Sequence, residues 1–162
     1  MDFTLTPEQK MVQQTVRDFV TRELLPLEGD VLRNEREGKP GITLEQIGQL
    51  QSRAREMGFW GINTPEEYGG ADLGPVMTAL VYMELARTFV PFTFGGSADN
   101  ILYYCNEEQK RRYLIPTISG ERRSCFALTE PGAGSDAGNI HMTAVKDGDS
   151  WILNGEKVFI TN

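Results

Sequence analysis

Residues 126–136 read Phe-Ala-Leu-Thr-Glu-Pro-Gly-Ala-Gly-Ser-Asp, and here the pattern of the chain changes from helical to extended. The first four residues resemble a short apolar strand. Gly132 and Gly134 would let backbone N–H groups approach an oxygen-rich ligand without obstruction by a side chain. Such a loop suits a phosphorylated planar cofactor. A glycine-rich loop alone is more often a plain strand-to-turn connection, here capped by Ser135 and Asp136. Other segments of the sequence must therefore decide whether this loop binds a cofactor.

Residues 1–120 predict a helical domain. Three capping patterns place a hydroxyl or amide side chain three positions before a glutamine, starting at Thr6, Thr43 and Asn106. Helices are therefore expected to begin directly after each of these residues, and Gly58 is placed to cap the second one.

The other boundaries in this domain follow from proline, glycine and apolar spacing. Pro26 is expected to end the first helix, and the glycine- and charge-rich residues 29–42 to form a loop. A helix over residues 76–88 has apolar residues around much of its circumference, which predicts burial on more than one side. A further helix is expected to start near Gly95 or Ser97.

Residues 121–162 predict short antiparallel strands. A turn is expected at Asp147-Gly148-Asp149. Asn154-Gly155 is a typical type I′ hairpin turn, so the chain is expected to reverse there as well. A helical domain followed by strands is an α+β order. The expected strands are residues 124–129, 143–145, 151–153 and 156–161.

Composition excludes several functional classes. The formal net charge of −7 argues against a broad nucleic-acid surface. The basic pairs at 111–112 and 122–123 are more simply solvated charges than a phosphate-binding patch. No apolar run is long enough to span a bilayer, and the N-terminus lacks the pattern of a signal or transit peptide. Cys105 and Cys125 lack metal-ligand spacing and favour neither a disulfide nor a metal site. A cytoplasmic location is expected from these features.

Several segments together resemble the acyl-CoA dehydrogenase family, and the resemblance covers essentially the whole chain. They are Leu5-Thr6-Pro7-Glu8-Gln9, Gly58-Phe59-Trp60-Gly61-Ile62, Pro65-Glu66-Glu67-Tyr68-Gly69-Gly70, residues 107–114, Thr129 to Asp136, and Lys157-Val158-Phe159-Ile160-Thr161-Asn162. We call residues 126–136 and 157–162 the first and second signature segments. The resemblance implies an N-terminal helical bundle-like domain followed by a few strands of an incomplete β-barrel domain.

The resemblance also implies FAD as cofactor. Thr129 would hydrogen-bond to the pyrimidine edge of the flavin, and Ser135 would contact the pyrophosphate and the pantetheine side of a bound CoA thioester. If residues 156–161 form a returning strand, Phe159 and Thr161 would point to the same face of it. The Phe159 ring would then pack on the flavin, and the Thr161 hydroxyl would reach N5 of the flavin ring. Many relatives carry tryptophan where this chain has Phe159. The implied FAD-binding residues are Phe126, Leu128, Thr129, Gly134, Ser135, Phe159, Ile160 and Thr161; Ser135 also binds substrate.

The family's catalytic base is a glutamate that no residue here matches, so it is expected beyond Asn162. Glu130 and Asp136 are expected to cap or pair rather than to act as acid and base, and Glu84 to take a partly buried pairing role. Phe92 and Phe94 would either limit the acyl pocket or, more simply, be core residues.

The implied activity is α,β-dehydrogenation of an acyl-CoA thioester, with an electron-transfer flavoprotein as electron acceptor and a homo-oligomeric assembly. The 162 residues alone are expected to be inactive. Two alternatives stay open: a related flavin oxidase or monooxygenase on the same fold, and a non-catalytic helical interaction module.

Overall fold

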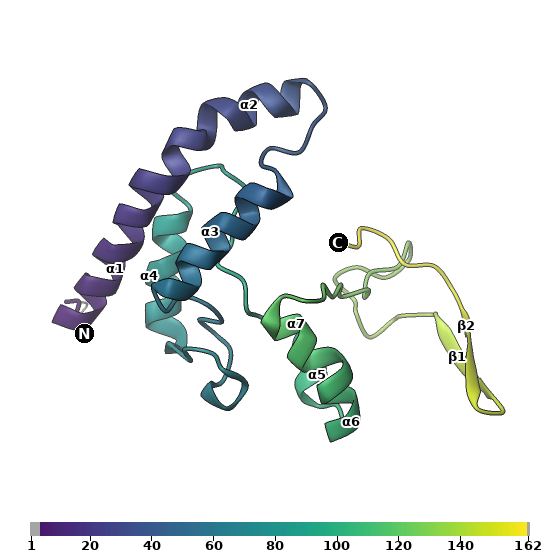
Figure 1. Ribbon diagram of the computed structural model, residues 1–162. Helices are drawn as coiled ribbons and strands as arrows, with labels where there is room; N and C mark the ends of the chain where they lie inside the picture. The colour runs from purple at the N-terminus through teal and green to yellow at the C-terminus, as the bar shows by residue number, and fades with distance from the viewer. Residues whose placement is uncertain (1–3, 162) are drawn as a thin grey trace.

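The chain is mainly helical, with two antiparallel strands near its C-terminal end, which confirms the expected fold class (Figure 1). The computed structural model describes residues 4–161. The split into domains at residue 120 remains a prediction. The α-helices are α1 (Pro7–Phe19), α2 (Glu28–Arg36), α3 (Leu44–Glu56), α4 (Gly74–Leu85), α5 (Asn100–Tyr103), α6 (Glu107–Gln109) and α7 (Ile115–Ser119). The remaining elements are π-helices Val20–Leu24 and Lys110–Leu114, 3-10 helices Leu25–Leu27 and Glu66–Tyr68, and strands β1 (Thr143–Asp147) and β2 (Ser150–Asn154).

All three predicted capping patterns are confirmed as reciprocal capping boxes. The side chain of Thr6 accepts a hydrogen bond from the Gln9 N–H at 3.2 Å, and the Gln9 side chain accepts one from the Thr6 N–H at 2.9 Å. The same exchange occurs at the starts of α3 and α6. Each box satisfies two backbone donors that the first turn of a helix leaves unpaired.

The helical path does not end at Pro26, and residues 29–42 are not all loop, because α2 occupies Glu28–Arg36. A π-turn makes this possible: the Leu25 N–H reaches back five residues to the Val20 carbonyl. The proline follows directly, where its missing N–H would interrupt an α-helix. The same arrangement recurs before Pro116, where the Ile115 N–H bonds to the Lys110 carbonyl.

Glycines set the boundaries of α3 and α5. Gly58, at φ +78, ends α3 as predicted. Its N–H donates to the Arg55 carbonyl, and the Phe59 N–H donates to the Ala54 carbonyl. These two bonds form a Schellman motif. The predicted start of the fourth helix is too early, because Gly95 and Gly96 have φ of +84 and +77 and cannot begin a right-handed helix.

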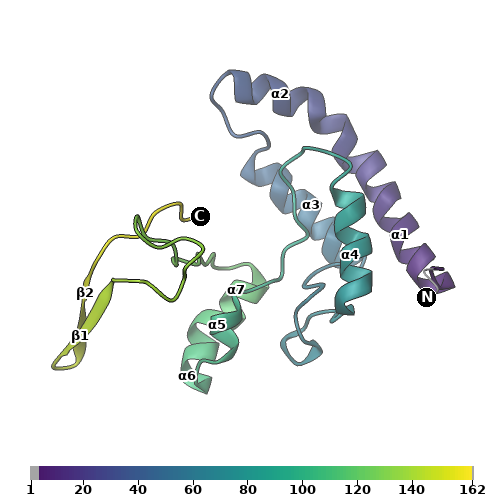
Figure 2. The same ribbon diagram turned by 180° about the vertical axis from the view of Figure 1, so that it is seen from behind.

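The core lies where α1, α3 and α4 meet, and both views show these three helices side by side (Figures 1 and 2). Four phenylalanines form its aromatic centre, with ring centroids 5.2–5.6 Å apart. They are Phe19, Phe59, Phe92 and Phe94. All four are buried, which confirms the core interpretation of Phe92 and Phe94.

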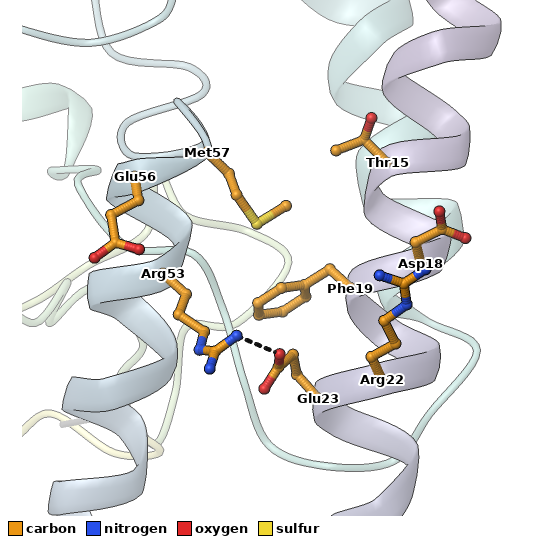
Figure 3. A pocket seen from close by; sticks show the side chains of 8 residues that line it. All are labelled: Thr15, Asp18, Phe19, Arg22, Glu23, Arg53, Glu56 and Met57. Carbon is orange, nitrogen blue, oxygen red and sulfur yellow. Dashed lines mark hydrogen bonds and ion pairs between the residues drawn. The ribbon is translucent and has the colours of Figure 1, made fainter.

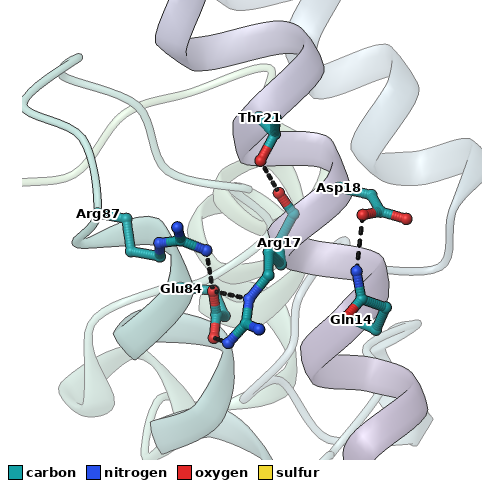
Figure 4. Close-up of polar contacts among 6 residues, drawn as sticks. All are labelled: Gln14, Arg17, Asp18, Thr21, Glu84 and Arg87. Carbon is teal, nitrogen blue, oxygen red and sulfur yellow. Dashed lines mark hydrogen bonds and ion pairs between the residues drawn. The ribbon is translucent and has the colours of Figure 1, made fainter.

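Glu84 ties α4 to α1, as predicted (Figure 4). Its buried carboxylate receives the Arg17 guanidinium through two nitrogens, at 2.7 and 3.0 Å, and Arg87 at 3.2 Å. The hydrogen bond from Arg17 lowers the pKa of Glu84 against the opposing effect of burial, and Arg87 adds to the lowering. The buried acid therefore stays ionised and paired.

The opposite face of α4 corrects the expectation of burial on more than one side. Val76, Tyr82 and Met83 are exposed in the described chain, whereas Leu80, Val81 and Leu85 are buried, the last two within the core. An apolar circumference predicts burial only where another element covers it.

The strand pattern differs from the prediction at both ends. β1 pairs with β2 from Thr143↔Asn154 to Asp147↔Ser150, so the chain reverses at the predicted turn Asp147-Gly148-Asp149. The second predicted reversal, at Asn154-Gly155, forms no hairpin, because the residues after it are not a strand. Gly148, at φ +58, supplies the left-handed conformation that short hairpin loops place on glycine. Neither residues 124–129 nor residues 156–161 form a strand. Every residue of the hairpin is exposed on both faces.

Candidate functional site

The two signature segments lie against each other, although they are nearly thirty residues apart in the chain. The Val158 N–H donates to the Thr129 carbonyl at 3.0 Å. The Lys157 ammonium donates to the Leu128 carbonyl at 2.8 Å. These contacts bring Thr129 next to the stretch that carries Phe159 and Thr161.

Glu130 is the polar centre of this contact. Its carboxylate accepts hydrogen bonds from the backbone N–H groups of His141 at 2.6 Å and Met142 at 3.0 Å, and from Lys157 at 2.9 Å. The side chain is buried. The prediction that Glu130 caps or pairs is confirmed. That it does not work as an acid or base remains a prediction. The side chain of Asp136 is exposed, and its capping or pairing role remains a prediction.

A tight turn presents the glycine loop. The Glu130 N–H donates to the Ala133 carbonyl at 3.0 Å, and the Ala133 N–H donates back at 3.1 Å. Open space surrounds Gly132 and Gly134, since a methyl group added to either would meet no atom within 4 Å. Among residues 4–161, no group accepts a hydrogen bond from the N–H of Gly132, Gly134 or Ser135. The loop thus offers several backbone donors to an anionic ligand, as the pyrophosphate of FAD requires.

Phe159 departs from the expected strand geometry. Its φ is +57, in the left-handed region that bulky residues rarely adopt, and its side chain is 93% exposed. The argument that Phe159 and Thr161 share one strand face is therefore wrong. Their contact with flavin remains a prediction, because strained and exposed aromatic residues are also found at ligand sites.

The other predicted flavin residues fall into two groups. Leu128, Thr129 and Ile160 are half-buried where the two signature segments meet. Phe126, Gly134, Ser135 and Thr161 are exposed. The contacts between the two segments bring Leu128 and Thr129 next to Lys157 and Val158, and the hydroxyls, open amides and apolar side chains of the two segments are of the kinds that bind a flavin nucleotide.

The pKa of Glu130 predicts a specific response to acid. The hydrogen bonds from His141, Lys157 and Met142, in that order, lower it to about 2 against the effect of burial. A carboxyl group with a lowered pKa in the folded state stabilises the fold above its unfolded pKa, and this contribution disappears as the pH falls toward the folded value. We therefore expect the stabilisation from Glu130 to persist at neutral pH and to decline between about pH 4.5 and pH 2.

An NMR titration of the His141 and Met142 amide protons measures this directly, because both donate to the carboxylate. We expect both resonances to move with a midpoint near pH 2, and Glu130→Gln to abolish the movement. A midpoint at the ordinary value for a glutamate would contradict the assigned contacts.

The described residues also line cavities outside the signature segments, and two of them are relevant here. One, between α1 and α3, has a volume of about 340 Å³ and contains the Arg53–Glu23 ion pair at 2.6 Å (Figure 3). None of its lining residues belongs to either signature segment. The other, of about 500 Å³, is lined by Phe92, Thr93, residues 95–99, Arg122 and Arg123 among others, and reaches Ser124 next to the first signature segment.

Two further findings concern the residues that the structure describes. No helix among them combines the length and the apolar character needed to cross a membrane. Residues 4–161 also contain no group of three or more histidine, cysteine, aspartate or glutamate side chains placed to hold a metal ion.

Comparison with known families agrees with this arrangement. The family model for the acyl-CoA dehydrogenase N-terminal domain matches residues 6–121, and the model for the acyl-CoA dehydrogenase middle domain matches residues 125–162. The chain belongs to the acyl-CoA dehydrogenase family. The first signature segment falls at the start of the stretch that the middle-domain model matches.

The relatives of this chain differ in the substrates that their names state. It is 38% identical to (R)-benzylsuccinyl-CoA dehydrogenase of Thauera aromatica, over 99% of this chain and 43% of that protein. It is 37% identical to the mitochondrial short-chain specific acyl-CoA dehydrogenase of Bos taurus, over 98% of this chain and 38% of that protein. The chain thus spans about two fifths of the length of these relatives.

A solved structure supports the same assignment. The crystal structure of an acyl-CoA dehydrogenase from Bacillus anthracis complexed with FAD matches with a TM-score of 0.68 and 33% identity, over 98% of this chain and 27% of that chain.

Sequence reasoning missed the role of Lys157. The residue stands in the second signature segment, but its partners Leu128 and Glu130 are 29 and 27 positions away. No local spacing rule connects them. The available signal was indirect: a lysine and a glutamate next to apolar residues expected to be buried need partners.

Proposed function

We propose that the protein containing this chain catalyses FAD-dependent α,β-dehydrogenation of an acyl-CoA thioester. The observation that carries this proposal is the meeting of the two signature segments at the Val158–Thr129 hydrogen bond, beside the open donors of the glycine loop. Family membership and the FAD-containing relative support it.

The residues of this chain would hold and shield the cofactor. The amides of Gly134 and Ser135 would bind the pyrophosphate, and the hydroxyl of Thr129 the pyrimidine edge of the ring. Phe159 would cover the ring with an aromatic surface, although without the N–H of an indole. FAD would supply the hydride-accepting chemistry. The acyl end of the substrate would lie toward residues 92–100, whose phenylalanines are buried beneath it.

The base for the substrate α-proton lies outside this set in our proposal. Glu130, the buried acid of the site, is already occupied by three donors, and its low pKa makes it a poor proton acceptor. We therefore expect residues 1–162 alone not to oxidise a thioester, and we place the base in a glutamate beyond Asn162. An electron-transfer flavoprotein as acceptor, a homo-oligomeric assembly and a cytoplasmic location belong to the same proposal.

The decisive experiment uses the full-length protein, mixed with FAD and desalted. We expect a retained visible flavin spectrum that bleaches when acyl-CoA thioesters are added without oxygen. Rapid return of the colour on admitting air would favour the alternative of an oxidase. A colourless protein would refute a flavin enzyme and favour a helical interaction module. Bleaching by residues 1–162 alone would place the base within this chain.

A further inference from the structure

The ion pair between Lys157 and Glu130 is enclosed by the protein. Only 16% of the Lys157 side chain and 6% of the Glu130 side chain are exposed, and the charged atoms are 2.9 Å apart. Lysine and glutamate are seldom buried unless they pair. The family signatures alone assign no role to this pair in binding or catalysis, so its burial requires a separate explanation.

The pair sets the alignment of the two signature segments. Lys157 reaches the Leu128 carbonyl and the Glu130 carboxylate, while its neighbour Val158 bonds to the Thr129 carbonyl. Three successive residues of the first segment are thus joined to two successive residues of the second. In the described chain no β-ladder connects these segments, so a shift of one residue would break all three bonds at once.

The other carboxylate contacts of Glu130 extend the alignment to the hairpin. The Glu130 carboxylate accepts hydrogen bonds from the N–H groups of His141 and Met142, which lie directly before β1. One side chain therefore joins three separate pieces of backbone. Charge-assisted hydrogen bonds are stronger and more directional than neutral ones, and a low-dielectric setting increases the loss when one partner is removed.

We propose that Lys157 and Glu130 form a positioning pair that holds the flavin-binding segments in register, so that FAD affinity depends on two residues that do not touch the cofactor. This inference rests on the proposed function, because it requires that the segments bind FAD. Buried ion pairs often contribute more to a unique arrangement than to stability, and the same is expected here.

The test replaces Lys157 in the full-length protein and measures FAD affinity by fluorescence. Lys157→Met keeps the length of the side chain but removes the charge. We expect its FAD dissociation constant to rise on the order of 10–100-fold, as observed when residues that orient the ligands of metal sites are replaced. Lys157→Arg keeps the charge and the donors, so we expect it to recover most of the affinity. Lys10→Met, on the exposed surface of α1, is the matched control and should bind FAD like the wild type.

A second measurement needs no cofactor. In the apoprotein, hydrogen exchange of the Val158 amide reports whether the segments remain aligned. We expect exchange to accelerate at least about 10-fold in Lys157→Met, but not in Lys10→Met, because exchange follows local opening. If Lys157→Met does not fold, Glu130→Gln takes its place, since it keeps the size of the side chain and loses the charge.

The outcomes separate the two proposals. Wild-type protein that binds no FAD overturns both the proposed function and this inference. Wild-type protein that binds FAD, together with a Lys157→Met variant of unchanged affinity and unchanged Val158 exchange, overturns the positioning role alone. Loss of affinity that Lys157→Arg restores supports it.

Discussion

Phe94→Ala lowers the free energy of unfolding by about 3–5 kcal/mol, the range for removing a buried aromatic ring. Phe94 is 3% exposed and lies at the centre of the aromatic cluster, 5.4 Å from Phe19, 5.2 Å from Phe59 and 5.6 Å from Phe92 between ring centroids. The substitution removes apolar area from three neighbours and leaves a cavity that they cannot fill. Urea unfolding followed by far-UV circular dichroism, which reports the helices, measures the loss.

Phe89→Ala is the matched control for this prediction. Phe89 is 51% exposed, and the same chemical change should cost well under half as much. Equal effects at the two positions would show that the aromatic cluster is not the centre of the core.

Gly96→Ala is expected to destabilise the fold by an amount comparable to that of Phe94→Ala. The cause is a steric clash and not the loss of buried apolar area. Gly96 has φ +77, and an added Cβ would lie 2.4 Å from the Gly61 nitrogen and 2.6 Å from atoms of the Trp60 ring. A left-handed conformation in a residue with a side chain and overpacking against backbone each cost about 1–3 kcal/mol. We expect a total of about 4 kcal/mol, measured by the same urea titration.

The control for this substitution is Gly48→Ala, on the surface of α3. An added methyl group there meets no atom within 4 Å, and alanine is the better helix former. The variant should therefore gain about 0.5–1 kcal/mol. A Gly96→Ala variant as stable as the wild type would mean that residues 61 and 96 are not packed against each other.

Features that depend on neighbouring residues could be predicted from the sequence. The three capping boxes, the Gly58 cap and the helical order each follow from side chains within a few positions. The pairing of Glu84 was also predictable, because an acid inside an apolar helix pattern needs a partner, although the identity of Arg17 was not. The family resemblance located the glycine loop and the second signature segment.

Features that depend on distant residues could not be predicted in this way. Pro26 predicted the end of a helix, because proline lacks the N–H that an α-helix needs. The π-turn that lets the helical path continue past it has no local sequence signal. The turn at Asp147-Gly148-Asp149 could be predicted, but Asn154-Gly155, a strong turn signal, forms no hairpin, because Lys157 and Val158 bond to the first signature segment instead of pairing with β2. Lys157 gained its role only when folding brought Leu128 and Glu130 beside it.

The hairpin has a consequence for how the molecule is layered. On one face Val145 lies opposite Ile152, and on the other Leu153 lies opposite Ala144 and Trp151 opposite Lys146. An outer sheet alternates apolar and polar residues, so that one face meets the core and the other meets water. Here both faces have apolar residues near the middle. The hairpin is thus patterned as an inner layer, suited to a covering surface on each side.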